Sequence, residues 1–415
     1  MSELSYLEKL LDGAEVEWVA LNKLATFLKG KSLPKEKITP DGNRYCIHYG
    51  ELFTHYGPII DKVCSKTNQA INESILSEKN DVLMPTSDVT PRGLATASCI
   101  QESGVILGGD ILIIRCSGVD GRYLSNFIIN NKKKILQMVK GSTVYHLYAK
   151  DIGKLLIPIP CPNNPEKSLA IQSEIVRILD KFTALTAELT AELNMRKKQY
   201  NYYRDQLLSF DESSVEWKTL LEACDYVDYR GKTPKKTQSG IFLVTAKNIR
   251  MGYIDYHASQ EFISEEDYAI VMRRGLPKKG DVLITTEAPC GFVAQVNREN
   301  IALAQRVIKY RSKNAQLSNS FLKHYLLGSQ FQDKLMQAAT GSTVKGIKGS
   351  RLHQLKIPIP SKVEQDRIVA ILDKFDTLTN SITEGLPREI ELRQKQYEYY
   401  RDLLFSFPKP ETVSK

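Results

Sequence analysis

Residues 178–182 read ILDKF, and the same five letters return at residues 371–375. Four further landmarks recur around this pair in the same order, each 197 to 200 positions later: VEW at 16–18, GSTV at 141–144, IPIP at 157–160 and QYNYYRD at 199–205, which returns as QYEYYRD. Five landmarks in one order indicate a tandem duplication of a unit of roughly 200 residues. Between the landmarks the two copies differ almost entirely. We therefore expect two copies that perform one kind of task on two different targets.

A long helix is predicted over residues 169–210. Its apolar residues follow the alternating four-and-three spacing of a coiled-coil seam, at Ile171, Ile175, Ile178, Phe182, Leu185 and Leu189. Tyr200, Tyr203 and Leu207 continue this seam, and Asn164-Pro165 suits a helix cap followed by proline in the first turn. At 1.5 Å per residue, about 40 residues span ~60 Å, which would hold two domains apart.

The second copy has a similar helix. Its seam runs through Ile368, Ile371, Phe375, Leu378 and Ile382. Ser361 to Glu364 predicts a capping box at its start, and Gly385-Leu386-Pro387 predicts a break. We expect the two helices to pack antiparallel within one molecule, with homodimerisation through them as the alternative. The pairs Tyr202-Tyr203 and Tyr399-Tyr400 could stack on bases, but their seam positions favour a helix interface.

Residues 186–193 read TAELTAEL, a four-residue repeat present twice. One added unit would lengthen a helix by ~6 Å, compared with ~3.4 Å for each base pair of B-DNA. If the partner is DNA, the repeat number could set the distance between two half-sites.

The N-terminus carries a third, partial copy. Residues 6–11 resemble residues 203–208, and each stretch is followed shortly by VEW. We therefore expect the first residues to pack beside the C-terminal helix, in a ring-like arrangement of the chain.

The bulk properties fit an intracellular protein with a nucleic-acid partner. The formal net charge is +9, and the seven cysteines are scattered without a C-x-x-C pair. Such a set of cysteines is typical of free thiols in a reducing cytosol. The first residues carry acids and no long apolar run, so no secretory signal is expected, and no stretch predicts a membrane span.

Residues 1–18, 154–210 and 355–410, about a third of the chain, resemble the specificity subunits of type I restriction-modification systems, and closely resemble the IC class. The resemblance implies that the two variable segments are target recognition domains, each reading one half of a split, asymmetric site in double-stranded DNA. It also implies that the helices set the unread spacer and dock two methylation subunits, which the restriction (motor-nuclease) subunits join. No cofactor is expected in this chain, while S-adenosylmethionine, ATP and Mg²⁺ would be used by the partner subunits.

The expected fold is α/β (α+β), with two tandem target recognition domains separated by two long antiparallel coiled-coil helices and related by a pseudo-twofold internal repeat. The expected boundaries are an N-terminal helix fragment at 1–12, recognition domains at 13–155 and 213–355, and helical spacers at 156–212 and 356–415. A cytoplasmic location without membrane contact is expected.

Contacts with DNA need Arg, Lys, Asn, Ser or Thr side chains, some at base edges and others on phosphates. In the second domain the basic, turn-forming or strand-terminal candidates are Lys232, Lys235, Lys236, Asn248, Arg250, Thr285 and Thr286. The glycine-rich basic loop that starts at Gly341 is the strongest candidate, with Thr343, Lys345, Lys348 and Arg351. The first domain offers Thr86, Ser87, Arg92, Arg115, Arg122 and Thr143. For each of these residues the alternative is a solvated surface or turn position.

No catalytic motif is complete. The chain contains no Pro-Pro, which excludes the Asp/Asn-Pro-Pro-aromatic motif of adenine methyltransferases, and Tyr226 stands where a phosphate loop ending in Gly231-Lys232-Thr233 needs glycine. Glu216-Trp217-Lys218 mimics half of a nuclease motif, but its repeat partner lacks the lysine. We therefore expect a non-catalytic DNA-reading subunit. A self-contained nuclease or methyltransferase, and a coiled-coil assembly protein without DNA contact, are the alternatives.

Overall fold

The landmark strands that open and close each copy are hydrogen-bonded to one another. In the first copy, β1 (Val16–Ala20) runs antiparallel to β14 (Leu156–Pro160). In the second copy, β15 (Glu216–Thr219) pairs in the same way with β24 (Lys356–Ile359). Each pair is a two-stranded ribbon, whose outer edge tolerates the prolines of IPIP because proline has no N–H to donate. Both ends of each copy therefore meet, and each copy closes on itself.

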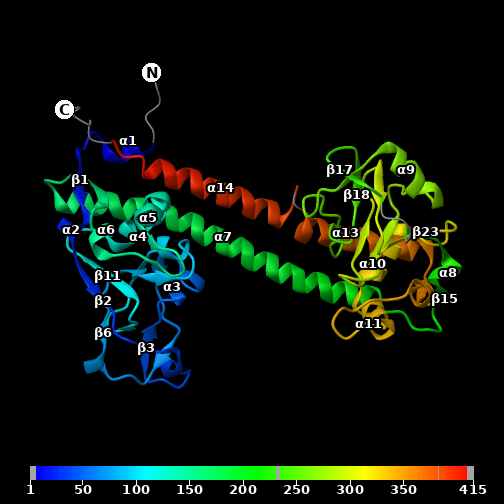
Figure 1. Ribbon diagram of the computed structural model, residues 1–415, viewed down its shortest axis with the longest axis horizontal. Coiled ribbons are helices and arrows are strands. Elements are labelled where there is room, and N and C mark those ends of the chain that lie inside the picture. Colours follow the sequence, from blue (N-terminus) through cyan, green and yellow to red (C-terminus); the bar gives the residue numbers. More distant parts are fainter. Residues whose placement is uncertain (1–5, 230–233, 382, 409–415) are drawn as a thin grey trace. The chain divides into compact units, whose positions relative to one another are not determined.

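The computed structural model describes residues 6–229, 234–381 and 383–408. It divides into unit 1, Met1–Ala187 with Glu391–Lys415, and unit 2, Glu188–Ile390 (Figure 1). Unit 1 thus takes in both ends of the chain.

The two ends of the chain share a hydrophobic cluster in unit 1. Helix α1 (Tyr6–Leu11) lies next to the C-terminal end of helix α14 (Leu386–Leu404) in Figure 1. Leucines of both helices are buried in the same cluster as the phenylalanines that follow α14, namely Leu7, Leu11, Leu404, Phe405 and Phe407. The prediction that the N-terminal residues pack beside the C-terminal helix is confirmed.

Unit 1 is built on two small sheets. The first has the strand order β2 (Ala25–Lys29), β11 (Ile111–Cys116), β7 (Val82–Pro85), β9 (Ser98–Ile100) and β4 (Ile59–Ile60). The second has the order β5 (Lys66–Thr67), β3 (Arg44–Ile47), β10 (Ile106–Leu107) and β6 (Ile75–Leu76). The helices between and after these strands are α2 (Leu21–Leu24), α3 (Glu51–Thr54), α4 (Gly121–Asn130), α5 (Lys132–Met138) and α6 (Ala149–Ile152). Helix α4 packs on β7 and β9 and buries Tyr123 and Phe127.

Unit 2 repeats this plan with different details. Its first sheet has the order β16 (Cys224–Asp228), β23 (Val307–Ser312), β20 (Val282–Thr285) and β21 (Val293–Gln295). The second has the order β17 (Lys236–Thr237), β19 (Phe262–Ile263), β18 (Ile241–Val244) and β22 (Ile301–Leu303). The accompanying helices are α8 (Leu220–Ala223), α9 (Glu265–Val271), α10 (Asn319–Leu327), α11 (Ser329–Ala338) and α12 (Gly349–Leu352).

Helix α7 (Pro165–Leu207) is continuous over 43 residues, as the seam predicts. It begins at the predicted proline, and the Asn164 side-chain oxygen caps it by accepting a hydrogen bond from the backbone N–H of Lys167 at 3.0 Å. Ile171 and Ile175 are buried in unit 1, and Tyr200 is buried in unit 2. The helix therefore contributes a different segment of its seam to the core of each unit.

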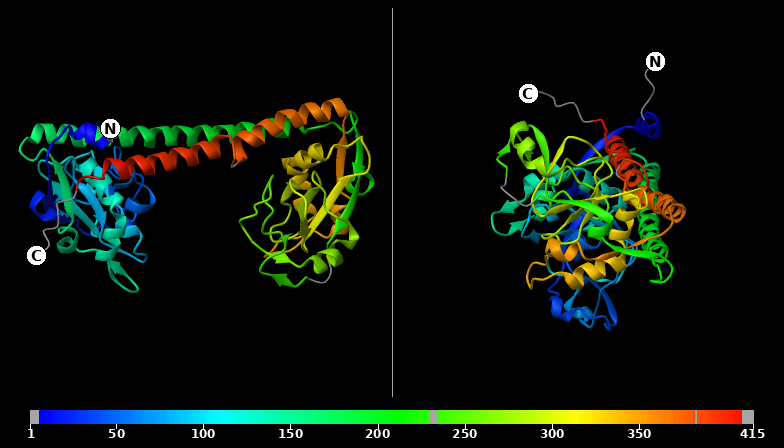
Figure 2. Two further views of the ribbon diagram at one scale, coloured as in Figure 1. Left: turned by 90° about the horizontal axis from the view of Figure 1, so that it is seen from above. Right: turned by 90° about the vertical axis from the view of Figure 1, so that its right-hand side faces the viewer.

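In each unit α7 lies beside a C-terminal helix that runs in the opposite direction (Figures 1 and 2). In unit 1 the partner is α14, where the rings of Phe182 and Tyr400 stack with centroids 5.2 Å apart. In unit 2 the partner is α13 (Lys362–Asn380), where Tyr203 stacks on Phe375 at 5.8 Å. The antiparallel arrangement is confirmed. Tyr203 and Tyr400 are helix-interface residues, whereas Tyr202 and Tyr399 are 61% and 65% exposed.

The predicted break in the C-terminal helix is confirmed. Helix α13 ends at Asn380 and α14 begins at Leu386. Gly385 has a φ of +83°, and a Cβ atom there would lie 2.4 Å from the carbonyl oxygen of Thr377, so only glycine fits.

The predicted capping box of α13 is half formed. The Ser361 hydroxyl accepts a hydrogen bond from the backbone N–H of Glu364 at 3.3 Å. The reciprocal bond is not formed, because the Glu364 carboxylate binds Arg367 at 2.6 Å instead.

Candidate nucleic-acid interface

Each GSTV landmark forms the tip of a hairpin. We call residues 140–147 and 340–347 the GSTV hairpins of units 1 and 2. In unit 1, β12 (Lys140–Gly141) pairs antiparallel with β13 (Tyr145–His146), and β13 pairs with β8 (Ser87–Asp88). The backbone N–H of Leu147 also donates to the carbonyl oxygen of Thr86 at 3.0 Å. The structure thus brings Thr86 and Ser87, which are distant in sequence, to the side of this hairpin.

The hairpin of unit 2 follows the same path. Thr340 and Gly346 exchange two backbone hydrogen bonds of 2.8 and 2.9 Å, and Gly346 forms a bridge with Glu287. The backbone N–H of Ile347 donates to the carbonyl oxygen of Thr286 at 2.9 Å. Thr286 therefore occupies the place that Thr86 has in unit 1.

The turn of each hairpin requires glycine. Gly141 and Gly341 have φ values of +125° and +111°, and a Cβ atom on either would lie 2.1 Å from the carbonyl oxygen of Val144 or Val344. Residues with a side chain rarely adopt such a backbone conformation, and here a Cβ atom would also collide with a backbone carbonyl oxygen. The four residues of each tip are exposed, including the two valines at 44% and 57%.

Basic side chains lie beside both hairpins. In unit 2, Lys345, Lys348 and Arg351 are exposed, and within the part of the chain that the structure describes neither lysine forms an ion pair. In unit 1, Lys140 binds Asp151 at 3.0 Å, and Lys154 lies 3.7 Å from the same carboxylate. Lys150 is exposed beside them, so a positive excess remains.

Arg92 extends the basic surface of unit 1. It is exposed four residues after β8, just before the turn that packs on α5. Burial and the positive charge of Arg92 lower the pKa of Lys132 at the start of α5. The turn that follows Arg92 packs on both α5 and β8. The Thr86, Ser87, Arg92 and Thr143 candidates therefore belong to one region.

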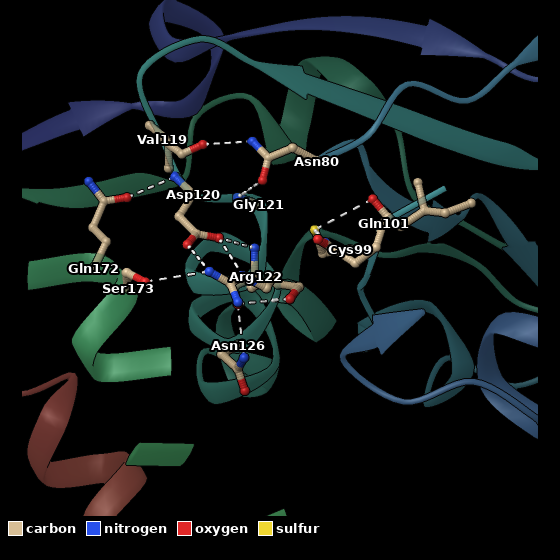
Figure 3. A network of polar contacts seen from close by, with 12 residues as sticks. Asn80, Cys99, Gln101, Val119, Asp120, Gly121, Arg122, Asn126, Gln172 and Ser173 are labelled. Atoms are coloured by element: carbon tan, nitrogen blue, oxygen red, sulfur yellow. Dashed lines mark hydrogen bonds and ion pairs between the residues drawn. The ribbon is translucent and has the colours of Figure 1, made fainter. Parts of the chain in front are cut away.

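Arg115 and Arg122 lie outside that region and bind carboxylates of the protein. Arg115 forms a bidentate pair with buried Asp81, at 2.9 and 2.8 Å, at the opposite end of β7 from Thr86. Arg122 turns back onto the helix-capping carboxylate of Asp120 at 2.8 Å and lies 3.5 Å from Ser173 (Figure 3). Both guanidinium groups stabilise the fold of unit 1 in this structure.

Three candidates of unit 2 are buried, among them Thr286, which is only 7% exposed. Thr285 is fully buried in β20. Asn248 is also fully buried, and its amide donates to the carbonyl oxygens of Asp255 and Ser259 at 3.0 and 2.8 Å. Their side chains hold loops in place and do not reach the surface.

The remaining candidates of unit 2 form a second group around the β17–β19–β18–β22 sheet. Lys236 pairs with Glu261 at 2.9 Å, and Arg250 pairs with Asp255 at 3.6 Å. Lys235 is exposed next to β17, whereas Lys232 lies outside the described residues. The structure separates this group from the hairpin group, which the sequence did not distinguish.

The sequence reasoning missed a pair of equivalent buried carboxylates. Asp281 binds Arg311 at 2.6 and 2.7 Å, as Asp81 binds Arg115. Each aspartate also accepts a hydrogen bond from the backbone N–H three residues before it, at 2.7 Å in unit 1 and 2.8 Å in unit 2. The signal was DVL at 81–83 and 281–283, with the same offset of 200 as GSTV. These pairs anchor the strands that lead to Thr86 and Thr286.

It also missed Arg298, in the second group. Its guanidinium lies 3.5 Å from the ring centroid of Tyr256 and 4.9 Å from that of Phe242. The Tyr256 hydroxyl in turn donates to Asn297 at 2.6 Å. Stacking on aromatic rings holds the guanidinium plane while its N–H edge stays available for paired hydrogen bonds. No spacing rule brings residues 242, 256 and 298 together.

No group of three or more His, Cys, Asp or Glu side chains among the described residues could hold a metal ion. Glu216 and Lys218, the half-motif of a nuclease, pair with each other at 3.2 Å. No helix in the described part of the chain is both long and apolar enough to cross a membrane.

Comparison with known families identifies the two copies. The family described as type I restriction modification DNA specificity domain matches this chain twice, over residues 14–196 and 217–392. The chain belongs to this family. Type I DNA specificity proteins recognise DNA rather than catalyse a reaction, so the expected non-catalytic role holds.

Relatives within the family match all or nearly all of the chain. The specificity subunit of the type I restriction enzyme EcoR124I/EcoR124II from Escherichia coli is 41% identical, with 100% of both chains covered. The EcoprrI specificity subunit from Escherichia coli is 35% identical over 92% of this chain and 93% of the relative.

Solved structures share the fold. The S subunit of a type I restriction-modification system from M. genitalium has a TM-score of 0.55 at 16% identity, covering 96% of this chain and 98% of that one. A chain from a structural study of complex assembly and conformational transition of the type I system has a TM-score of 0.61 at 16% identity, covering 94% and 97%. The expected mixed α/β fold with tandem specificity domains and long helices is confirmed.

Proposed function

We propose that this chain reads a bipartite, asymmetric site in double-stranded DNA, with one half-site read by each unit. The observation that carries the proposal is that the two copies share their landmark elements but differ in the segments between them. Both copies are closed by the same ribbon and both present a GSTV hairpin, but the segments between these landmarks differ. Recognition domains at 13–155 and 213–355 would hold those segments, and residues 1–12, 156–212 and 356–415 would form the common helical part.

The contacts are proposed for two regions. The hairpin regions supply Thr86, Ser87, Arg92 and Thr143 in unit 1, and Thr343, Lys345, Lys348 and Arg351 in unit 2. The second group of unit 2 supplies Lys235, Lys236, Arg250 and Arg298. Asn248, Thr285 and Thr286 are left out because they are buried. Arg115 and Arg122 are left out because they bind carboxylates with side chains that are only 27% and 34% exposed.

The chain would act in the cytoplasm within a larger enzyme. We propose that its helices dock two methylation subunits, which carry S-adenosylmethionine, and that restriction subunits using ATP and Mg²⁺ join through them. The named relatives, which are specificity subunits of type I restriction enzymes, support these partners. All seven cysteines are free thiols, which supports a reducing compartment.

A domain exchange tests the proposal. Residues 213–355 are replaced by the equivalent segment of a relative, and the methylated sites are mapped by methylome sequencing of cells carrying the complete system. Only one half of the bipartite motif should change, because unit 1 is untouched. A change in both halves would contradict separate reading by the two units.

A further inference from the structure

The tips of the two GSTV hairpins are identical, although the units around them are not. Residues 141–144 and 341–344 share all four letters, their glycines share one backbone conformation, and their tips are exposed. An exposed tip has no packing role that would require the same side chains twice. Two units that read different sequences are expected to differ where they touch bases, so an identical tip points to a contact that both half-sites have in common.

The chemistry of the tip fits the sugar–phosphate backbone. Ser142 and Thr143, like Ser342 and Thr343, place hydroxyl groups at the surface beside the backbone N–H groups of a tight turn. Hydroxyl and backbone N–H groups are common donors to phosphate oxygens. Such contacts fix the position of a protein on DNA without reading the base sequence.

Both tips have lysines beside them, but the lysines stand at different positions of the repeat. The equivalent positions are Lys140 and Thr340, Tyr145 and Lys345, Tyr148 and Lys348, and Lys150 and Ser350. In unit 1 the ammonium groups of Lys140, which also pairs with Asp151, and of Lys150 lie 5.9 and 5.8 Å from the ring centroid of Tyr148. A contact that needs positive charge but no particular geometry is typical of phosphates, whereas base edges and protein partners require matched positions.

Both hairpins are anchored in the same way. Leu147 and Ile347 are buried at the foot of the hairpin, and their N–H groups bind the carbonyl oxygens of Thr86 and Thr286. The strands that end at those threonines are held at their other ends by Asp81 and Asp281. The height of each tip above its sheet is therefore set by elements that the two units share.

We infer that the two GSTV hairpins are sequence-independent clamps on the DNA backbone, which register each unit on its half-site while other residues of the unit read the bases. The inference rests on the proposed function and assigns a separate task to one part of the proposed contact surface. It predicts that the hairpins are interchangeable.

The test exchanges residues 140–148 with residues 340–348 in the complete system. Both segments are native to the chain and have equal length, so each unit receives a hairpin that already folds in its counterpart. We expect the methylated motif to stay the same in both halves. A changed base in either half-site would overturn the inference, because the hairpin would then be reading sequence.

A second variant measures the clamp itself. Ser→Ala and Thr→Ala at positions 142, 143, 342 and 343 should weaken binding to the target duplex and to an unrelated duplex by the same factor, roughly 2- to 10-fold per hairpin. Lys345→Ala and Lys348→Ala should each reduce the slope of log affinity against log salt by about one, while Lys374→Ala on α13 serves as the control. Unchanged melting temperatures of the variants would exclude unfolding as the cause of weaker binding.

Three results separate the possibilities. Loss of target binding with unchanged binding to the unrelated duplex would contradict the clamp. Unchanged DNA binding with lost assembly of the methylation subunits would also contradict it and would identify the tips as a protein interface. If the unaltered complex has no bipartite motif at all, the proposed function fails before the clamp is tested.

Discussion

At the scale of single residues, the two buried aspartates form the same ion pair with arginine in both units but have different neighbours. Asp81 binds Arg115, which has a second partner in exposed Glu78. Asp281 binds Arg311 and also lies 3.7 Å from Lys309, whose side chain is only 4% exposed. Burial lowers the pKa of Lys309, and the charge of Asp281 works against that change. The charge of Lys309 is therefore more dependent on Asp281 than the charge of Arg115 is on Asp81, because Arg115 has Glu78 as a second partner.

Asp281→Asn should destabilise the protein more than Asp81→Asn. Removing one partner of a buried pair leaves an uncompensated charge and typically costs about 3–5 kcal/mol. In Asp81→Asn the exposed Glu78 still neutralises Arg115, so the loss of unfolding free energy should be smaller. Urea unfolding of both variants checks the order, and equal losses would show that Lys309 is not held by Asp281.

Arg298 should read a base in the half-site of unit 2. Its guanidinium is stacked on Tyr256, and a planar guanidinium can form two hydrogen bonds to one guanine in the major groove. Arg298→Lys keeps the charge but loses this geometry, so the methylated motif should become degenerate at one position, with about 1–3 kcal/mol less discrimination there. Methylome sequencing measures the degeneracy at each position of the motif. An unchanged motif in Arg298→Lys would show that Arg298 does not read a base.

At the scale of elements, α7 is weakly packed where its sequence repeats. The boundary between the two units falls between Ala187 and Glu188, inside the TAEL repeats. Ala187, Glu188, Thr190 and Ala191 are exposed, whereas Ile175 and Tyr200 nearer the two ends of the helix are buried. Extra residues in the repeat would therefore leave the cores of both units intact.

Adding a third TAEL unit should alter the unread spacer and leave both half-sites unchanged. The insertion lengthens the helix by ~6 Å and turns it by about 40°. Mapping of methylated sites in cells with the complete system gives the spacer and the half-site letters together. Changed half-site letters would show that α7 is not a spacer element.

At the scale of the whole molecule, one unit is closed by both ends of the chain and the other by its middle. In unit 1 the rings of Tyr123 and Phe127 lie 5.5 and 5.6 Å from Phe405, and the Trp18 indole N–H donates to Pro408 at 2.6 Å. In unit 2, Phe210, the equivalent of Phe407 in the repeat, contacts Phe321. The protein has two tryptophans, one in each unit, and each reports on its own unit.

Phe405→Ala should destabilise unit 1 by about 3–5 kcal/mol, because a buried ring leaves a cavity. In a Trp217→Phe background the fluorescence of Trp18 should report unfolding at a lower urea concentration. In a Trp18→Phe background the midpoint reported by Trp217 should stay where it is. Leu208→Ala, at the equivalent buried position of unit 2, is the reciprocal control. Equal shifts at both tryptophans would mean that the units do not unfold separately.

The sequence by itself determined the duplication, the long helix from Pro165 and the break at Gly385. These features rest on local rules, namely repetition, the seam period and the geometry that only glycine allows. It also determined that the GSTV segments matter, because their identity stands out against divergent surroundings.

Only the tertiary structure decided which candidates share a surface. Thr86 meets the hairpin of residues 140–147 through β8 and β13, and Arg115 is drawn away from that surface to buried Asp81. Arg298 meets Tyr256 and Phe242 in the same way, across more than 40 residues of chain. Strand register and buried ion pairs join residues that are far apart in sequence, so no local pattern could separate an arginine that stabilises the fold from one that faces solvent.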